Sequence, residues 1–341
     1  MRCLLKFKLF LLTSCAVLLL AACGGGGPQE NLVRIPLGAG GFGFLPLQMM
    51  REYGLIEKHA QAAGLDELTV EWLELGGPAV MNDALLAGSV DFIAAGPPAF
   101  ITLWDRTRGS VNIKGVAAIA ALPMYLNTRA PHLNRLEDLT QNDRIAVTAI
   151  KVSIPAIVMQ IYALETYGLE AFDQYDDYTV TMTHADGVVS MLSGSTEITS
   201  HFTSPPFYQR ETADPDIRTI MSTDDVLGGP TTFTMLSTTQ AYHDTNPEAY
   251  QAVLTALEEA QLMIRENPQA AVDVLMAAGQ GGGLPAEELL SVLADPDITF
   301  TSTPQNTMRY AQFMHAVGSL NNEPTSWTEM FFPEIHTADG N

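Results

Sequence analysis

Short apolar runs alternate with amphipathic segments along most of the chain. Apolar runs of about four to eight residues next to Gly or Pro are typical of buried strands, whereas apolar residues three or four apart are typical of helices. We predict strands at residues 32–37, 68–75, 90–95, 111–121, 144–149, 178–183, 197–203, 217–221 and 231–237. We predict helices through Met49, Met50 and Tyr53 and at residues 78–86, 98–104, 153–167 and 246–279, the last broken at Pro268. Strands that alternate with helices predict an α/β protein with open, mostly parallel sheets covered on both faces.

Two stretches of the chain carry similar motifs in the same order. The first copy contains Arg34-Ile35, Tyr53-Gly54-Leu55, Leu86–Phe92 and Gly96-Pro97-Pro98. The second copy contains Arg144-Ile145, Tyr167-Gly168-Leu169, Leu192–Ile198 and Ser204-Pro205-Pro206. Such a repeat indicates two copies of one supersecondary plan, although strand, turn and helix patterns also recur by chance in α/β proteins. We therefore predict two similar lobes with a cleft between them.

The order of the elements predicts how the chain is divided between the lobes. We assign residues 32–122 and 233–332 to a discontinuous first lobe, residues 123–232 to an inserted second lobe, and residues 333–341 to a C-terminal tail. The turn Gly228-Gly229-Pro230 precedes a β-branched run, which we interpret as the chain crossing back to the first lobe. The two connecting segments are then expected to act as hinges.

The N-terminus has the pattern of an export signal. Arg2, Lys6 and Lys8 precede an apolar stretch at residues 9–20, which is short for a membrane span. Small residues follow this stretch, as they do before a cleavage site. We predict that residues 1–22 are a signal peptide.

The end of this segment predicts a lipid anchor. The sequence Leu20-Ala21-Ala22-Cys23 resembles a bacterial lipobox, in which the cysteine is lipidated and becomes the mature N-terminus. We predict that Cys23 carries the lipid and that the glycine-rich residues 23–31 form a flexible tether, which places the protein in the periplasm or on the outer face of the cell membrane. Because Cys3 and Cys15 leave with the signal, the mature fold has no thiol for a disulfide, a zinc site or a nucleophile. Lipidation at Cys15 and an ordinary signal peptide cut elsewhere are the alternatives.

The charge of the chain is strongly acidic and restricts its partners. The sequence has 17 basic and 39 acidic residues, a net charge of −22. Without Arg2, Lys6 and Lys8, 14 of the 17 basic residues remain against the 39 acidic ones, a net charge of −25. A surface of this sign repels phosphate backbones, so nucleic-acid binding is excluded as a function. An anionic ligand has to be held by local donors against the field of the whole protein.

The common catalytic motifs are absent from the sequence. It contains no Gly-x-Ser-x-Gly elbow, Walker loop, dinucleotide fingerprint after a strand or His-Glu-x-x-His motif. The seven histidines lie far apart, without the spacing of metal ligands. Paired carboxylates such as Asp176-Asp177 fall in loop or solvated contexts, which lack the apolar setting of a general acid. We predict no catalytic residue, no metal and no cofactor.

Loops at the carboxyl ends of strands form the predicted binding site, because open α/β sheets bind ligands there. Glycines let a ligand approach the backbone closely, and helix N-termini offer free amide groups. We predict that the ligand contacts Phe42, Gly43, Phe44, Gly96, Pro97, Thr148, Lys151, Ser153, His201, Phe202 and Thr203.

These residues have different expected roles. Phe42 and Phe44 are expected to be aromatic walls, since they lie in a glycine-rich loop. Lys151 is the only cation on these loops, and it is expected either to meet an anionic group or to face solvent. Ser153 can donate its hydroxyl to a ligand or cap the helix that follows. His201 follows a strand end and is expected to point into the cleft.

The motifs also resemble a known family. The resemblance is carried by Leu86–Phe92 with Gly96-Pro97-Pro98, by Arg144–Val147, and by Gly194–Phe207. These stretches are similar to substrate-binding proteins of nitrate, taurine and alkanesulfonate ABC importers, a superfamily that includes binders of thiamine-pyrimidine precursors. The resemblance covers roughly residues 32–320. It implies the type II periplasmic-binding-protein fold, closure of the two lobes on a small solute, and delivery to the permease subunits of an ABC importer.

Three functions are compatible with this sequence. The first is a lipid-anchored receptor that captures a small solute for an importer, with anionic and aromatic molecules as the candidate solutes. The second is an exported enzyme on the same fold, similar to a pyrimidine-precursor synthase, for which only His201 and Lys151 are candidate reactive residues. The third is a solute sensor that signals to a membrane partner.

Overall fold

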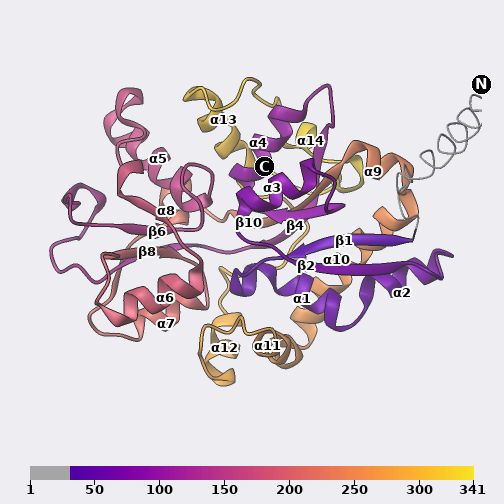
Figure 1. Cartoon of the computed structure of the whole chain (residues 1–341), viewed down its shortest axis with the longest axis horizontal. Coiled ribbons are helices and arrows are strands. Elements are labelled where there is room, and N and C mark those ends of the chain that lie inside the picture. The colour runs from indigo at the N-terminus through magenta and orange to yellow at the C-terminus, as the bar shows by residue number, and fades with distance from the viewer. Residues whose placement is uncertain (1–30) are drawn as a thin grey trace, which may run out of the picture.

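The computed structural model describes residues 31–341, which form an α/β protein of two lobes (Figure 1). The strands are β1 (Leu32–Leu37), β2 (Thr69–Glu74), β3 (Phe92–Ala95), β4 (Ile113–Ala121), β5 (Tyr125–Thr128), β6 (Ile145–Val147), β7 (Thr179–Thr181), β8 (Ser200–Thr203), β9 (Arg218–Ser222) and β10 (Thr232–Thr239). The helices are α1 (Leu45–Glu52), α2 (Leu55–Ala62), α3 (Pro78–Leu86), α4 (Pro97–Thr107), α5 (Ile154–Tyr167), α6 (His184–Ser193), α7 (Phe207–Thr212), α8 (Thr223–Leu227), α9 (Gln240–Thr245), α10 (Pro247–Glu266), α11 (Pro268–Ala277), α12 (Ala286–Leu293), α13 (Thr307–Ala316) and α14 (Trp327–Met330). The predicted α/β fold is confirmed. The predicted signal peptide, Cys23 and residues 23–30 of the tether lie outside the described residues.

The first lobe contains β1, β2, β3, β10 and β4. β1 and β2 are parallel, and β10 lies between β3 and β4, antiparallel to both. The backbone N–H of Asp91 donates to the carbonyl oxygen of Arg34 (2.9 Å), and their side chains form an ion pair at 2.8 Å. These contacts attach the start of β3 to β1.

The second lobe contains a sheet of five strands in the order β7, β6, β8, β5 and β9. β6 is parallel to β7 and β8, whereas β5 is antiparallel to β8 and β9. The sheets are therefore mixed, where the sequence predicted mostly parallel ones. The difference comes from β5 and β10, because each enters its sheet from the other lobe and runs against its neighbours.

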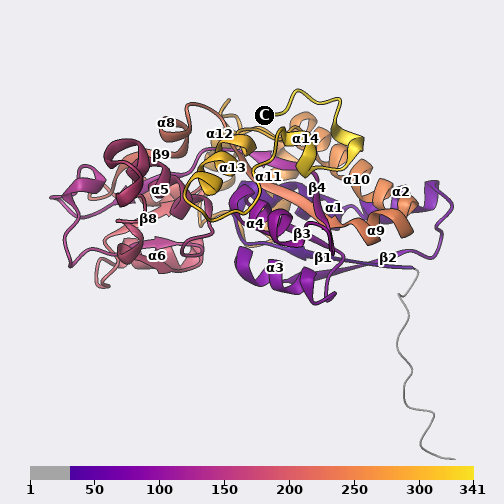
Figure 2. The ribbon, with the colours of Figure 1, turned by 90° about the horizontal axis from the view of Figure 1, so that it is seen from above.

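The chain crosses between the lobes twice. β4 ends at Ala121 and β5 begins at Tyr125 in the other sheet, and β9 ends at Ser222 before β10 begins at Thr232. Figures 1 and 2 show the two lobes side by side, with α5 to α8 around the second sheet. The exact division at residues 122/123 and 232/233 stays a prediction.

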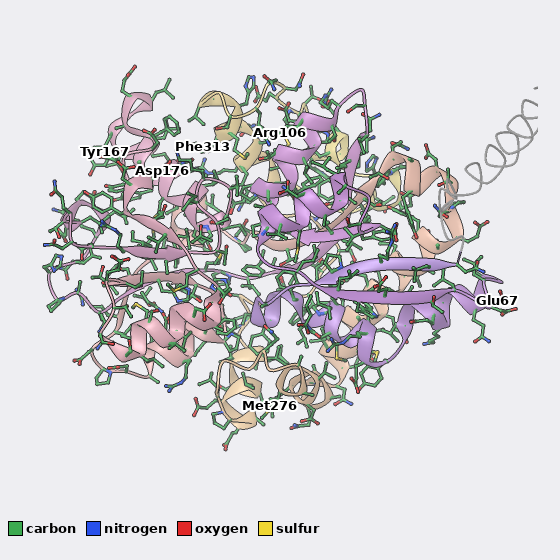
Figure 3. The ribbon with its side chains drawn as sticks, viewed as in Figure 1. Glu67, Arg106, Tyr167, Asp176, Met276 and Phe313 are labelled. Carbon is green, nitrogen blue, oxygen red and sulfur yellow. The ribbon has the colours of Figure 1, made fainter. Side chains whose placement is uncertain are left out.

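The C-terminal third of the chain packs mainly on the first lobe. Pro268 separates α10 from α11, at the break that the sequence predicted. Phe331 forms a β-bridge with Gly115 of β4. α13 also reaches the second lobe, because the ring centroids of Phe313 and Phe172 lie 6.4 Å apart (Figure 3). Within residues 31–341, no helix has both the length and the apolar composition needed to cross a membrane.

Several elements differ from the sequence prediction. The strand predicted at 197–203 begins only at Ser200, and the helix through Met49 ends at Glu52. Gly54 adopts a left-handed conformation (φ 58°), so that a separate helix, α2, starts directly after it. β5 was not predicted, because four residues between two loops carry too weak a pattern.

Candidate ligand-binding site

A cavity of about 200 Å³ lies between the two lobes. Its lining consists of residues 38–40, Phe44, 75–78, Met81, 94–96, Ala99, Met124, Thr148, 152–155, 181–184, Phe233 and Thr234. Most of these residues follow the carboxyl ends of β1, β2 and β3 in the first lobe and of β6 and β7 in the second. This is the position at which open α/β sheets bind ligands.

Four helices begin at the cavity, but prolines remove part of their donors. α3, α4 and α5 carry a proline in the first two positions, namely Pro78, Pro97 and Pro155. Proline fits the first turn of a helix but has no N–H to offer a ligand. The helix starts therefore contribute fewer hydrogen bonds than their number suggests.

Two aromatic rings form one wall of the cavity. The rings of Phe44 and Phe233 meet edge to face, with centroids 6.4 Å apart. A Cβ at Gly38 would lie 2.2 Å from the Phe44 ring, and a Cβ at Gly43 would lie 2.0 Å from the Phe233 ring. The glycines of this loop are thus needed to make room for the two rings, since no real Cβ comes so close to another atom.

Methionines supply a further part of the lining. Met81, Met124 and Met182 reach the cavity from α3, from the first crossing segment and from the loop after β7. Thioether side chains are flexible and polarizable, and they contact aromatic rings favourably. The lining is therefore predominantly apolar and adaptable.

The polar groups of the lining are neutral and few. Among residues 31–341, no Asp, Glu, Lys or Arg side chain lines the cavity. Ser153 donates its hydroxyl to the carbonyl oxygen of Ala149 (2.6 Å), so it does not cap α5 with its side chain. Thr183 caps α6 by accepting from the backbone N–H of Asp186. Thr234 has a buried hydroxyl for which the described part of the chain provides no hydrogen-bond partner.

Among the described residues that line the cavity, His184 is the ionisable one, and burial keeps it neutral. Burial, and then the neighbouring His201, lower the pKa of His184 to about 3. Its Nδ1 lies 3.2 Å from Nε2 of His201 and 3.1 Å from the hydroxyl of Thr203. Phe207 stacks against the His184 ring, with centroids 5.6 Å apart.

A buried polar chain continues behind His184. Nδ1 of His201 lies 2.6 Å from the Glu211 carboxylate, and both side chains are almost fully buried. Asn127 donates to the other Glu211 oxygen at 2.8 Å and accepts from the hydroxyl of Thr219 at 2.7 Å. Satisfied networks of this kind fix the orientation of their members.

The structure places four of the predicted site residues at the cavity. Phe44, Gly96, Thr148 and Ser153 belong to its lining. Gly43 lies under the Phe233 ring, and Pro97 starts α4 without reaching the lining. The role of all these residues in binding stays a prediction.

The other predicted residues point elsewhere. Phe42 and Phe202 are fully buried in the hydrophobic core, so they are not cavity walls. The Lys151 side chain is 67% exposed, and its ammonium lies 3.9 Å from Asp176 of the second lobe (Figure 3). His201 and Thr203 contact His184 and belong to the network behind the cavity rather than to its lining.

The sequence prediction missed His184, Phe233 and the methionines. His184 occupies the start of α6 in the second copy of the repeat, where Pro78 starts α3 in the first copy. Both residues line the cavity, but the start of α3 was not a predicted site either, so the repeat gave no signal for His184. Met124 lies in the first crossing segment and Phe233 lies directly after the second, and the sequence carried no binding signal for either segment.

The predicted loop after β8 is occupied by contacts between the lobes. A Cβ at Gly41 would lie 2.5 Å from Pro206 and 2.7 Å from the Pro205 carbonyl oxygen. Gly282 approaches Pro206 and Phe207 from the loop between α11 and α12. The backbones meet closely here, which removes this loop from the cavity.

Comparisons with known proteins support the fold that this geometry describes. No protein-family model matches the chain, and no curated protein matches its sequence. Among solved structures, the alkanesulfonate-binding protein SsuA of Xanthomonas axonopodis pv. citri, bound to MOPS, has a TM-score of 0.63 at 16% identity and covers 88% of this chain and 97% of its own. The nitrate-binding protein NrtA of Synechocystis PCC 6803 has a TM-score of 0.65 at 15% identity, covering 88% of this chain and 84% of its own.

A third similar structure is a Candida albicans gene product described as defining a new family with the generic periplasmic-binding-protein fold. It has a TM-score of 0.64 at 15% identity and covers 88% of this chain and 94% of its own. At such identities the likeness concerns the fold. The chain has the periplasmic-binding-protein fold, and the sulfonate and nitrate binders are structural neighbours of it.

Proposed function

We propose that this chain is the solute-binding subunit of an ABC importer and works outside the cytoplasm. The observation that carries the proposal is a cavity between two lobes, in a chain that has the fold of the periplasmic sulfonate- and nitrate-binding proteins. Residues 123–232 would move against residues 32–122 and 233–332. Because a ligand shifts such an equilibrium only if it prefers one state, it has to contact both lobes when they close.

The ligand that this cavity suits is small, uncharged and largely apolar. A dry cavity of about 150 Å³ holds benzene in another protein, so about 200 Å³ suits a molecule of one or two small rings. Within the described chain no cation lines the cavity, and the net charge of −22 opposes an anion. In this proposal Phe44 is a wall, Gly96 allows close approach to the backbone, and Thr148 offers a hydroxyl.

The anchor and the partner complete the proposal. Lipidation of Cys23 would hold the protein at the membrane, and residues 23–31 would let it reach the permease subunits of the importer. A sensor would bind the same solute and contact a different membrane partner. Loss of uptake of the solute on deletion of the gene supports transport, whereas intact uptake favours sensing.

The enzyme alternative has little support from the geometry. It depended on Lys151 and His201, but Lys151 faces solvent near Asp176 and His201 lies behind His184. A binding protein returns its ligand unchanged. Incubation of the full chain with a bound compound, followed by mass spectrometry, separates the two functions, since consumption of the compound contradicts the proposal.

A thermal-shift panel tests the class of ligand. We expect small neutral aromatic and heteroaromatic compounds to stabilise the full chain, by about 2.7 kcal/mol at 100 times Kd, and sulfonates and nitrate to have no effect. Phe44→Ala should reduce the shift at least several-fold, while Lys151→Ala, at an exposed position, should leave it unchanged. Stabilisation by sulfonates alone would contradict the proposed ligand class.

A further inference from the structure

The buried chain behind His184 has a feature that the cavity alone does not explain. Glu211 lies in the interior of the second lobe with no exposed side-chain surface. Its oxygens contact His201 and Asn127, and within residues 31–341 neither Lys nor Arg pairs with it. An uncompensated carboxylate charge is costly in the interior, so the Glu211–His201 pair is expected to be neutral overall. Either Glu211 is protonated beside a neutral His201, or Glu211 is ionised beside a protonated His201.

In both states the Nε2 atom of His201, which faces His184, carries a hydrogen. If the proton is on Glu211, the carboxyl donates to Nδ1 of His201, and this neutral ring carries its own proton on Nε2. If the proton is on His201, both ring nitrogens are donors. In either state Nε2–H of His201 donates to Nδ1 of His184, 3.2 Å away.

His184 is then restricted to one tautomer. Its Nδ1 accepts from His201, and the hydroxyl of Thr203 at 3.1 Å supplies a second donor to the same atom. The ring remains neutral because burial and His201 lower its pKa. Its single proton must therefore sit on Nε2, on the edge of the ring opposite to the network.

The packing around the two rings holds this arrangement in place. A Cβ at Gly187 would lie 2.4 Å from Cε1 of His201, so only glycine lets α6 lie so close to that ring. Phe207 covers one face of His184. The ring is thus held by a face contact and by its Nδ1 edge, and the residue also lines the cavity.

We propose that Glu211 and His201 hold His184 as a hydrogen-bond donor to the cavity, so that the solute carries a matching acceptor such as a ring nitrogen or a carbonyl oxygen. This inference rests on the proposed function and adds a specificity-determining residue to it. The apolar residues of the lining set the size of the solute, and Nε2–H of His184 selects among molecules of the same shape. An analogue without the acceptor leaves this buried donor unpaired and therefore binds more weakly.

The tautomer is measured directly and without a ligand. Long-range ¹H–¹⁵N spectra of the full chain labelled with ¹⁵N-histidine resolve the seven histidines, and His184→Gln assigns the signal. We expect the Nε2–H tautomer for His184 at pH 7. Glu211→Gln should keep it, because the amide oxygen can face Asn127 while the amide nitrogen donates to His201. An Nδ1–H tautomer or a mixture in the wild-type protein overturns the inference.

Matched probes test the consequence for selectivity. Quinoline and naphthalene have nearly the same shape, but only quinoline has an acceptor nitrogen. We expect quinoline to bind about fivefold to tenfold more tightly than naphthalene, the range of one net hydrogen bond, and His184→Phe to abolish the preference. Equal affinity of the wild type for both probes overturns the inference. Absence of binding by either probe counts against the proposed ligand class, while the spectra still decide the tautomer.

Discussion

The two lobes repeat one plan, but they contribute opposite chemistry to the cavity. In both copies, a backbone N–H at the start of the third strand, β3 or β8, donates a hydrogen bond to the carbonyl oxygen of an arginine. The acceptor is Arg34 of β1 in the first copy and Arg144, directly before β6, in the second. The helix that follows the second strand of each copy, α3 or α6, begins at the cavity. Within residues 31–341, the first lobe lines the cavity with glycine, alanine, proline, leucine, methionine and phenylalanine, and Thr234 is its only polar side chain there.

The second lobe supplies most of the polar side chains of the lining. Thr148, Ser153, Thr181, Thr183 and His184 all come from this lobe. The loop after β8, the third strand of the second copy, packs against Gly41 of the first lobe and does not face the cavity. The first copy thus supplies mainly apolar contacts, and the second copy supplies most of the hydrogen-bonding groups. Two copies of one scaffold can therefore contribute different kinds of contact to a single binding site.

The largest expected effect separates two predicted site residues, Phe202 in the core and Phe44 at the cavity. Phe202 follows the pattern of a site residue in the sequence but has no exposed surface. We expect Phe202→Ala to lower the free energy of unfolding by about 3–5 kcal/mol, because it leaves a cavity in the core of the second lobe. Phe44→Ala, at the edge of the cavity, should cost clearly less. Denaturant unfolding of both variants measures the difference, and equal losses would contradict the division.

A smaller effect tests the role of glycine in the first lobe. A Cβ at Gly43 would collide with the Phe233 ring at 2.0 Å, whereas the Cβ of Gly76 would meet only Val80 at 3.6 Å. We expect Gly43→Ala to destabilise the protein by about 1–3 kcal/mol through overpacking, and Gly76→Ala to change stability by less than about 0.5 kcal/mol. Thermal unfolding of the pair checks this. A neutral Gly43→Ala would show that the aromatic wall moves freely.

The sequence predicted the scaffold better than the site, for a physical reason. Strong local patterns, such as the Pro78–Leu86 helix, are encoded by nearby residues and were found. Phe42 and Phe44 occupy one short turn, and only its tertiary setting decides that Phe42 enters the core and Phe44 the cavity. Other features of the site depend on contacts between residues far apart in the sequence. Examples are the contact between His184 and His201 and the packing of Gly41 against the loop after β8.

A pH effect tests how the lobes meet near the second crossing. Burial, and then repulsion from Asp297 and Asp225, raise the pKa of Asp224 to about 6. Because the folded protein holds this proton more tightly than the unfolded chain, the carboxyl stabilises the fold below pH ~4, and that stabilisation is lost as the pH rises through about 6. Asp224→Asn should therefore raise stability by about 1 kcal/mol at pH 7, allowing for solvent screening, and have little effect at pH 4.

The control for Asp224 is an exposed aspartate of the same lobe. Asp216→Asn removes one charge from the surface and should change stability little at either pH. Unfolding measured at both pH values compares the two variants. A gain for Asp224→Asn that is the same at pH 4 and pH 7 would contradict a role for the carboxyl charge.

The smallest effect concerns Thr234, the polar exception in the first lobe. Its buried hydroxyl has no partner among the described residues, so the isosteric change Thr234→Val removes an unpaired polar group and should raise the free energy of unfolding by up to about 1 kcal/mol. If the hydroxyl serves the solute, the same change should weaken binding of quinoline two- to fivefold. Thr223→Val is the matched control, because the Thr223 hydroxyl already accepts from the backbone N–H of Met124 and its loss should destabilise the fold. If Thr234→Val is stable and binds quinoline with unaltered affinity, the first lobe contributes no side-chain hydrogen bond to this ligand. All such hydrogen bonds then come from the second lobe.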